Sequence, residues 1–302
     1  MLHMDLKRFL DRIKYAGPTK PLGIDLLNEL CVHFVSSIPF DTLDNFGGRK
    51  RDFHLTVLYN KIVHERRGEN CIGLNAILYW MLHELGYSVE ICFGCAYDAG
   101  KQCFDDDRHH IVVLVTLDSG QTWVADVGTG GRSSLLPLQL DRLNVEQSQP
   151  NGIFIVTKHD NWYVVSKKKQ IQLDTDGSKL QPRNAQTRTS QSKYQINDEW
   201  TVIFGFNDEP KHLDDLSDIY IHSQEKHPLT TCNSLAIQLD RNHRKLLLGS
   251  VFVEKKYIDP MTVQVVRKRN CGHGDHNKIL EVEFGIVLDF ELKPKSNLAS
   301  LD

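Results

Sequence analysis

The sequence lacks the features that mark a membrane protein or a nucleic-acid-binding protein. Its 36 Lys and Arg residues are nearly balanced by 39 Asp and Glu residues, so the net charge of -3 creates no strong field for a polyanion. No apolar run approaches the roughly 20 residues that cross a bilayer. The charged N-terminal segment also lacks the uninterrupted apolar core of a signal peptide. We therefore expect neither a membrane partner nor a nucleic-acid partner.

Cysteine is sparse as well, with seven residues at wide and irregular spacings. An odd number of cysteines without a secretory signal favours reduced thiols and a cytoplasmic location. Cys92 and Cys95 have the spacing of zinc ligands, with Cys103 nearby and the polar segment 271–276 much later. Strand alternation would point Cys92 and Cys95 to opposite faces, so we expect buried, inert thiols and no metal site.

The period of the apolar residues changes along the chain. Up to residue 87 the apolar residues recur at helical spacing, and from residue 88 to 197 they alternate as in antiparallel strands. The polar stretch 166–196 is poor in large apolar residues and marks the end of this middle part. Strand-like and helical runs follow in 198–302. The pattern predicts an α+β protein with a helical domain, an antiparallel sheet domain and a small α/β domain.

Cys71 is the best candidate for a nucleophile. It stands in the segment RRGENCIGLN, directly before an apolar helical repeat that extends from Leu74 to Leu85. The free N–H groups and the partial positive charge of a helix N-terminus favour a thiolate over a thiol. The sequence therefore predicts a reactive thiol at the start of this helix.

A hairpin further along the chain supplies a base and a carboxylate. If residues 118–120 form a three-residue turn, the numbers of paired residues sum to 238, and His110 and Asp126 become diagonal neighbours on one face. Diagonal neighbours lie roughly 7 to 8 Å apart at the backbone, which the two side chains can bridge. A two-residue turn without a bulge would put them on opposite faces. The hypothesis therefore depends on the register of this hairpin.

Together these residues would form a nucleophile, a base and a group that orients the base. If Asp126 holds one imidazole nitrogen of His110, the other nitrogen can take the proton of Cys71. This arrangement is typical of acyl transfer in several unrelated enzyme classes. Nothing in the local sequence shows that Cys71 meets His110, and most Cys and His pairs have no joint role.

Four motifs occur in the order of a known family, and the chain resembles the arylamine N-acetyltransferases over nearly its whole length. This resemblance implies a Cys71, His110 and Asp126 triad, with His110 rather than His109 as the base. It also implies an N-terminal helical bundle, an antiparallel β-barrel and a C-terminal α/β lid. The motifs are IPFDTLDN at 38–45, RRGENCIGLN at 66–75, RHHIVVLV at 108–115 and VADVGTG at 124–130.

The resemblance also implies residues that support the triad. In the family, the acid of the first motif pairs with the arginine before the cysteine loop, which here would be Asp41 with Arg67. Such an ion pair would fix the loop of the nucleophile. Asn75, one helical turn after Cys71, matches a recurring polar position, for which packing is as good an explanation as catalysis.

The chain departs from the family where donor and acceptor would meet. Glu69 and Asn70 stand where the family has a glycine and an aromatic residue, and Thr129 stands where it has an aromatic residue. With Phe40 and Gly128, we expect Asn70 and Thr129 to line a smaller and more polar substrate pocket. Such a pocket could admit another acyl group, including malonyl.

The resemblance implies an enzyme that moves an acetyl or related acyl group from acyl-CoA to an arylamine, hydrazine or hydroxylamine by a ping-pong reaction. Acetyl-CoA or malonyl-CoA would be a co-substrate, and no permanently bound cofactor is expected. Ser223, Thr230 and Thr231 resemble the family's coenzyme A contacts. Two alternatives remain open: a transglutaminase-like cysteine hydrolase, and a noncatalytic CoA-binding relative.

Overall fold

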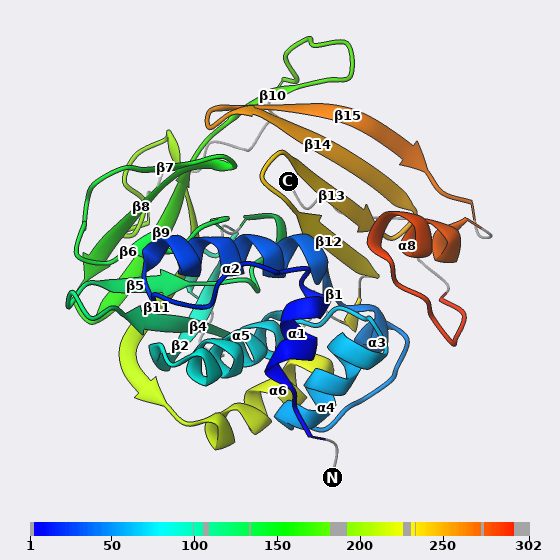
Figure 1. Ribbon diagram of the computed structural model, residues 1–302. Helices are drawn as coiled ribbons and strands as arrows, with labels where there is room; N and C mark the ends of the chain where they lie inside the picture. Colours follow the sequence, from blue (N-terminus) through cyan, green and yellow to red (C-terminus); the bar gives the residue numbers. More distant parts are fainter. Residues whose placement is uncertain are drawn as a thin grey trace.

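A computed structural model describes residues 3–98, 100–104, 109–132, 134–181, 192–225, 231–232, 234–272 and 275–292. It contains a nine-stranded sheet and a six-stranded sheet. Helices α1, α3, α4, α5 and α6 gather on one side of the two sheets, and α8 covers the six-stranded sheet (Figure 1). The predicted α+β fold, with a helical part, a nearly closed barrel and a lid, is confirmed.

The helices have the following bounds: Leu6–Arg12 (α1), Ile24–Ser37 (α2), Leu43–Phe46 (α3), Leu55–Tyr59 (α4), Cys71–Leu85 (α5), Leu216–Glu225 (α6) and His276–Phe284 (α8). A π-helical turn, Asn60–His64, continues α4, and short 3-10 turns occupy Gly130–Arg132 and Leu213–Asp215.

The strands of the nine-stranded sheet are Ser88–Asp98 (β2), Cys103–Phe104 (β3), His110–Thr116 (β4), Thr122–Ala125 (β5), Leu138–Gln139 (β6), Gln147–Gln149 (β7), Gly152–His159 (β8), Trp162–Lys168 (β9) and Trp200–Lys211 (β11). Those of the six-stranded sheet are Phe40–Asp41 (β1), Ile171–Leu173 (β10), Leu235–Leu239 (β12), His243–Leu248 (β13), Val251–Asp259 (β14) and Thr262–Asn270 (β15).

Helix α5 is the central helix of the molecule, and its ends are defined by local chemistry. The Asn70 side chain accepts hydrogen bonds from the N–H groups of Ile72 and Gly73, which would otherwise lack partners in the first turn. Gly86 ends the helix in the left-handed conformation, at φ 97°. The helix packs against β2 and β4 of the barrel. This packing places Cys71, at the N-terminus of α5, beside the barrel strand that begins with His110.

The hairpin of β4 and β5 has the predicted register. Val113 pairs with Ala125 and Thr116 with Thr122, so paired numbers sum to 238. Gly120 takes a positive φ of 81°, as a three-residue turn requires. Because the two strands alternate in step, His110 and Asp126 meet on one face.

Glutamine side chains join the two ends of the nine-stranded sheet. Gln147 accepts from the N–H of Gln139 at 2.9 Å and donates to its carbonyl at 3.0 Å. Gln149 bonds both backbone groups of Leu136 in the same way, at 2.8 and 2.9 Å. These amides replace a backbone ladder between β6 and β7, so the sheet forms a nearly closed barrel.

The two sheets do not follow the domain boundaries expected from the sequence. Strand β11 was expected in the third domain, but it lies between β2 and β9 of the barrel. Strands β1 and β10 come from the first and second parts, yet both pair in the six-stranded sheet. A three-part division thus remains a proposal, and its second boundary belongs after Lys211, because strand order depends on pairing between distant segments.

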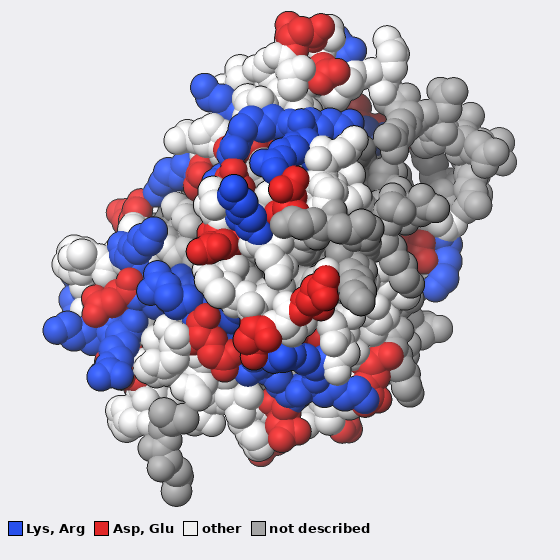
Figure 2. All heavy atoms as spheres, turned by 90° about the vertical axis from the view of Figure 1, so that its right-hand side faces the viewer, with Lys and Arg blue, Asp and Glu red and all other residues white. Residues whose placement is uncertain are grey.

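The surface carries both signs of charge. Acidic and basic side chains are interspersed on the face shown in Figure 2. Arg267 of β15 pairs with Glu283 at 2.7 Å, and Lys245 of β13 pairs with the same carboxylate at 2.9 Å, which ties α8 to two strands of the six-stranded sheet. None of the described helices is long and apolar enough to cross a membrane.

Candidate active site

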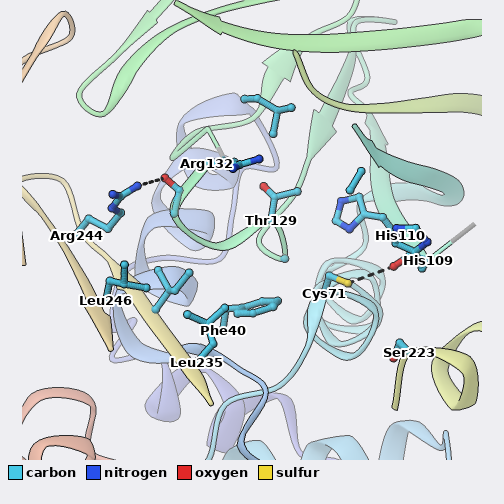
Figure 3. A pocket seen from close by; sticks show the side chains of 15 residues that line it. Phe40, Cys71, His109, His110, Thr129, Arg132, Ser223, Leu235, Arg244 and Leu246 are labelled. Atoms are coloured by element: carbon cyan, nitrogen blue, oxygen red, sulfur yellow. Dashed lines mark hydrogen bonds between the residues drawn. The ribbon is translucent and has the colours of Figure 1, made fainter. Parts of the chain in front are cut away.

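Cys71 is the first residue of α5, and its side chain is partly exposed at the bottom of a cavity. The Sγ atom donates a hydrogen bond to the carbonyl of His109 at 3.4 Å (Figure 3). His109 and His110 both line the cavity beside this thiol. The structure therefore brings the proposed nucleophile and the proposed base together.

His110 and Asp126 form a buried hydrogen-bonded pair. The Nε2 atom of His110 lies 2.9 Å from Oδ2 of Asp126. Burial by itself disfavours the imidazolium, but the Asp126 carboxylate and the Cys71 side chain outweigh this effect and raise the pKa of His110 to about 10. Burial also favours neutral Asp126, yet His110 holds the pKa of this carboxyl below its usual value. His110 is therefore a strong base toward a neighbouring thiol.

Two further groups hold the Asp126 carboxylate. Its Oδ1 atom accepts from the Asn75 side chain at 2.9 Å and from the N–H of Gly128 at 2.7 Å. Asn75 is fully buried and also bonds the backbone of Ile111 and Val127. Asn75 therefore links α5 to β4 and to the loop that follows β5.

Residue 128 has room only for a glycine. A Cβ atom at Gly128 would lie 2.8 Å from Cα and 2.7 Å from the carbonyl oxygen of Cys71. The loop after Asp126 thus passes directly against the backbone of the nucleophile. Any larger residue there would push the loop and α5 apart.

The expected ion pair between Asp41 and Arg67 is wrong. Arg67 pairs with Asp44 at 2.7 Å, and Asp44 also binds Lys61 at 3.1 Å and Arg51 at 2.9 Å. The Asp41 carboxylate instead accepts from backbone N–H groups, including that of Gly68 at 3.0 Å. The two acids are three residues apart in one motif, and only the packed loop decides which of them meets the guanidinium.

We expect Asp44→Asn to lower the free energy of unfolding by about 3 to 5 kcal/mol, because it leaves buried cations without their shared anion. Burial would raise the pKa of Asp44, but Lys61 and Arg67 outweigh it and hold the pKa well below its usual value of 3.8. A depressed pKa stabilises the fold above that value, and the gain is lost as the pH falls below it. The wild-type advantage in urea unfolding should therefore shrink in acid.

Asp289→Asn is the matched control for this prediction. Asp289 pairs with Arg49 at 2.9 Å, but its side chain is 74% exposed, so its removal should leave the urea midpoint unchanged. If Asp44→Asn unfolds at the same urea concentration as Asp289→Asn, the buried cluster does not support the nucleophile's loop.

The expectation that Asn70 lines the substrate pocket is also wrong. Asn70 is 1% exposed, caps α5 and donates to the hydroxyl of Ser223 at 3.2 Å. Its neighbour Glu69 is equally buried and binds Lys61 at 2.8 Å. The two residues that distinguish this chain just before Cys71 therefore stabilise the loop and do not face a substrate.

Three other expected residues do line the cavity: Phe40, Gly128 and Thr129. The cavity has a volume of about 180 Å³, and roughly 150 Å³ of apolar cavity is enough to hold benzene. An aromatic ring can therefore occupy the space above Cys71.

Of the two expected coenzyme A contacts that the structure describes, Ser223 reaches this cavity and Thr231 does not. Ser223 lines it from α6, where its hydroxyl donates to the carbonyl of Tyr220 at 2.9 Å. Thr231 is partly exposed, beside Cys232. Thr230 lies outside the described residues.

Several lining residues were not anticipated. Leu235, Ile237, Arg244 and Leu246 reach the cavity from lid strands β12 and β13, and Arg132 reaches it from the loop after Thr129. The HRKLLL run that carries Arg244 resembles any half-exposed strand, so its sequence gives no sign of a pocket. Within the described part of the chain, no group of three or more His, Cys, Asp and Glu could hold a metal ion.

Comparisons with known proteins agree with this geometry. The chain matches the model of the N-acetyltransferase family over residues 23–293. The liver isozyme of arylamine N-acetyltransferase from Gallus gallus is 26% identical over 294 residues, which cover 96% of this chain and 98% of that protein. Arylamine N-acetyltransferase 2 of Rattus norvegicus is 25% identical and is covered, like this chain, to 97%.

Solved structures share the fold. Arylamine N-acetyltransferase from Salmonella typhimurium superposes with a TM-score of 0.77 at 20% identity, over 94% of this chain and 92% of that one. The Mycobacterium marinum enzyme in complex with CoA gives 0.75 at 23% identity, over 93% of each chain. A Bacillus cereus enzyme described as having a unique Cys-His-Glu triad gives 0.74 at 17% identity, over 95% of this chain and 100% of that one.

Because the family model covers most of its length, the chain belongs to the arylamine N-acetyltransferase family, as its four motifs predicted, and it is an enzyme.

Proposed function

We propose that this enzyme transfers an acetyl group from acetyl-CoA to the nitrogen of an aromatic amine, hydrazine or hydroxylamine, with Cys71 as the acyl carrier. Two contacts carry the proposal. The Cys71 thiol donates a hydrogen bond to the carbonyl of His109, directly before His110, and the imidazole of His110 is hydrogen-bonded to Asp126 at 2.9 Å. The CoA complex of the Mycobacterium marinum relative supports acyl-CoA as the co-substrate.

The reaction has two steps. His110 takes the proton of Cys71 through Nδ1, because its Nε2 faces Asp126, and the sulfur attacks the thioester carbonyl of acetyl-CoA. The bond from the acetyl carbon to the coenzyme A sulfur breaks, and His110 gives the proton to that sulfur. The amine nitrogen then attacks acetyl-Cys71, His110 takes the proton of the amine, and the proton returns to the leaving Cys71 sulfur.

The N–H of Cys71 is our candidate donor to the oxyanion that forms in both steps. The N–H groups of Ile72 and Gly73 already donate to Asn70, and the N–H of Asn70 donates to Glu69. These bonds leave the first N–H of α5 as the backbone donor beside the reacting carbonyl.

For coenzyme A we propose contacts with Ser223, Thr230 and Thr231. Ser223 supports this proposal because it lines the cavity on the side of Cys71. We also propose a cytoplasmic location, which is consistent with the seven cysteines all being free thiols.

Mass spectrometry of the intact protein tests the proposed function. Mixing with acetyl-CoA should place one acetyl group on Cys71, and an added arylamine should discharge it as the amide. Malonyl-CoA serves as a second donor, since the sequence also admits a related acyl group. A folded protein that forms no adduct with any acyl-CoA would contradict the mechanism.

The family match does not favour the two alternatives, and the same experiment separates them. A hydrolase would form the adduct but lose it equally fast without amine, because water would be the acceptor. A noncatalytic CoA-binding relative would bind acyl-CoA and leave Cys71 unmodified.

A further inference from the structure

The cavity has two chemically different ends. Cys71 and His110 lie at one end, Arg244 lies at the other, and Phe40 and Thr129 lie between them (Figure 3). Among the described residues, the lining includes two arginines and no aspartate or glutamate. The end of the cavity opposite the thiol therefore carries the positive charge of Arg244, next to the apolar side chains of Leu235 and Leu246.

The guanidinium of Arg244 is held in place by the loop that follows Asp126. Its Nη1 donates to the carbonyl of Gly131 at 3.0 Å. A Cβ atom at Gly131 would lie 2.9 Å from this same guanidinium nitrogen, so the loop and the guanidinium are in direct contact. No carboxylate among the described residues forms an ion pair with Arg244, and its remaining N–H groups are available to a ligand.

Two lysines that are not among the lining residues add positive charge near Arg244. Lys167 of β9 and Lys255 of β14 lie near it, and burial together with the charges of Arg244 and Lys255 lowers the pKa of Lys167 to about 7. Lys255 is the cross-strand neighbour of Arg244, so its charge adds to the repulsion that an anion bound to Arg244 would relieve.

The loop from 128 to 131 limits the distance between the two ends. Gly128 lies against the backbone of Cys71, and Gly131 lies against the side chain of Arg244. Three residues span at most about 10 to 11 Å. A Cβ atom at Gly130, which lies between the two, would be 3.0 Å from the side chain of Ile237. The span suits a benzene ring that has its amine near the thiol and an acidic group at the far end.

Building on the proposed function, we propose that Arg244 binds a carboxylate on the aromatic amine that accepts the acyl group. Arg132 also lines the cavity and adds a second positive charge to its lining. A malonyl group fits this site less well, because its carboxylate is only two carbon–carbon bonds from the thioester carbonyl. Arg244 thereby selects aminobenzoate-like acceptors over neutral arylamines of the same shape.

The test compares 4-aminobenzoate with its neutral analogue 4-aminobenzamide, with acetyl-CoA as the donor. In the wild-type enzyme kcat/KM should be about tenfold or more higher for the acid, as expected for a charge-assisted hydrogen bond. Arg244→Gln should remove this preference, mainly through KM, and leave the amide within about twofold. Arg244→Lys should retain part of it, since lysine keeps the charge but loses the planar fork.

Arg241→Gln is the matched control, because Arg241 lies three residues away and pairs with Glu29 on the surface. This variant should leave kcat/KM unchanged for both the acid and the amide. If Arg244→Gln lowers kcat/KM equally for both substrates, Arg244 only supports the Gly131 loop, and the proposal is overturned. A wild-type enzyme without preference for the acid would also overturn it.

Two further outcomes separate this proposal from the function on which it rests. If Arg244→Gln slows acylation by malonyl-CoA but not by acetyl-CoA, and leaves the acceptor preference intact, the carboxylate belongs to the acyl group and the proposal is wrong. If the folded wild-type enzyme acetylates neither amine, the proposed function itself fails. Acetylation of the amide without preference for the acid refutes only the role of Arg244.

Discussion

Replacing Cys71 by alanine should abolish acetyl transfer, lowering kcat/KM at least about 10³-fold. Cys71 is the only cysteine among the described lining residues of the cavity, so no other thiol can carry the acyl group there. Burial raises the pKa of Cys31 and of Cys92 to about 12, which makes both thiols poor nucleophiles. Arylamine acetylation and the intact mass after incubation with acetyl-CoA would both be measured.

Cys103→Ala is the control, since Cys103 is an exposed free thiol. This variant should keep full activity and still show the adduct. Turnover that persists in Cys71→Ala, or an adduct that moves to another cysteine and is discharged by the amine, would refute the proposed nucleophile.

Asp126→Asn should lower kcat by about 10⁴-fold, the scale observed when the orienting acid of such a triad loses its charge. Without the carboxylate, only the Cys71 side chain would oppose the effect of burial, so the pKa of His110 would fall and the thiol would keep its proton at neutral pH. The Oδ1 atom of Asp126 accepts hydrogen bonds from Asn75 and from the N–H of Gly128. If the amide nitrogen of an asparagine at residue 126 took this position, it could accept neither bond.

The pH profile distinguishes this positioning role of Asp126 from simple misfolding. The acylation rate of the wild-type enzyme should change little through neutral pH, because His110, with its pKa raised to about 10, already accepts the proton of the thiol. In Asp126→Asn the rate should climb steadily with pH, as hydroxide removes that proton instead. Asp126→Glu keeps the carboxylate and should lose less activity. An Asp126→Asn enzyme with a wild-type profile would contradict this role.

Features that depend on near neighbours in the chain could be predicted from the sequence. The N-terminus of α5 follows from Asn70 and the apolar repeat after Cys71, since capping acts within one turn. The register of the β4 and β5 hairpin follows from its turn, because side chains alternate with period two. His110 and Asp126 could therefore be paired by counting.

Features that depend on contacts between distant segments could not be predicted in this way. The choice of Asp44 over Asp41 as the partner of Arg67 is made where α3 and the loop before α5 pack together. The inward position of Glu69 follows from its ion pair with Lys61 across the π-helical turn. Nothing in the local sequence shows which of the two acids meets Arg67, or that Glu69 points inward.

The sequence by itself predicted which residues would serve as the thiol, the base and its orienting acid, and it determined the family to which the chain belongs, because these features lie in short motifs with local structural rules. Only the tertiary structure decided what faces the thiol. The cavity is completed by strands β12 and β13, which lie more than a hundred residues after Cys71 in the chain. Arg244 comes to lie opposite Cys71 only when these strands pack beside the barrel.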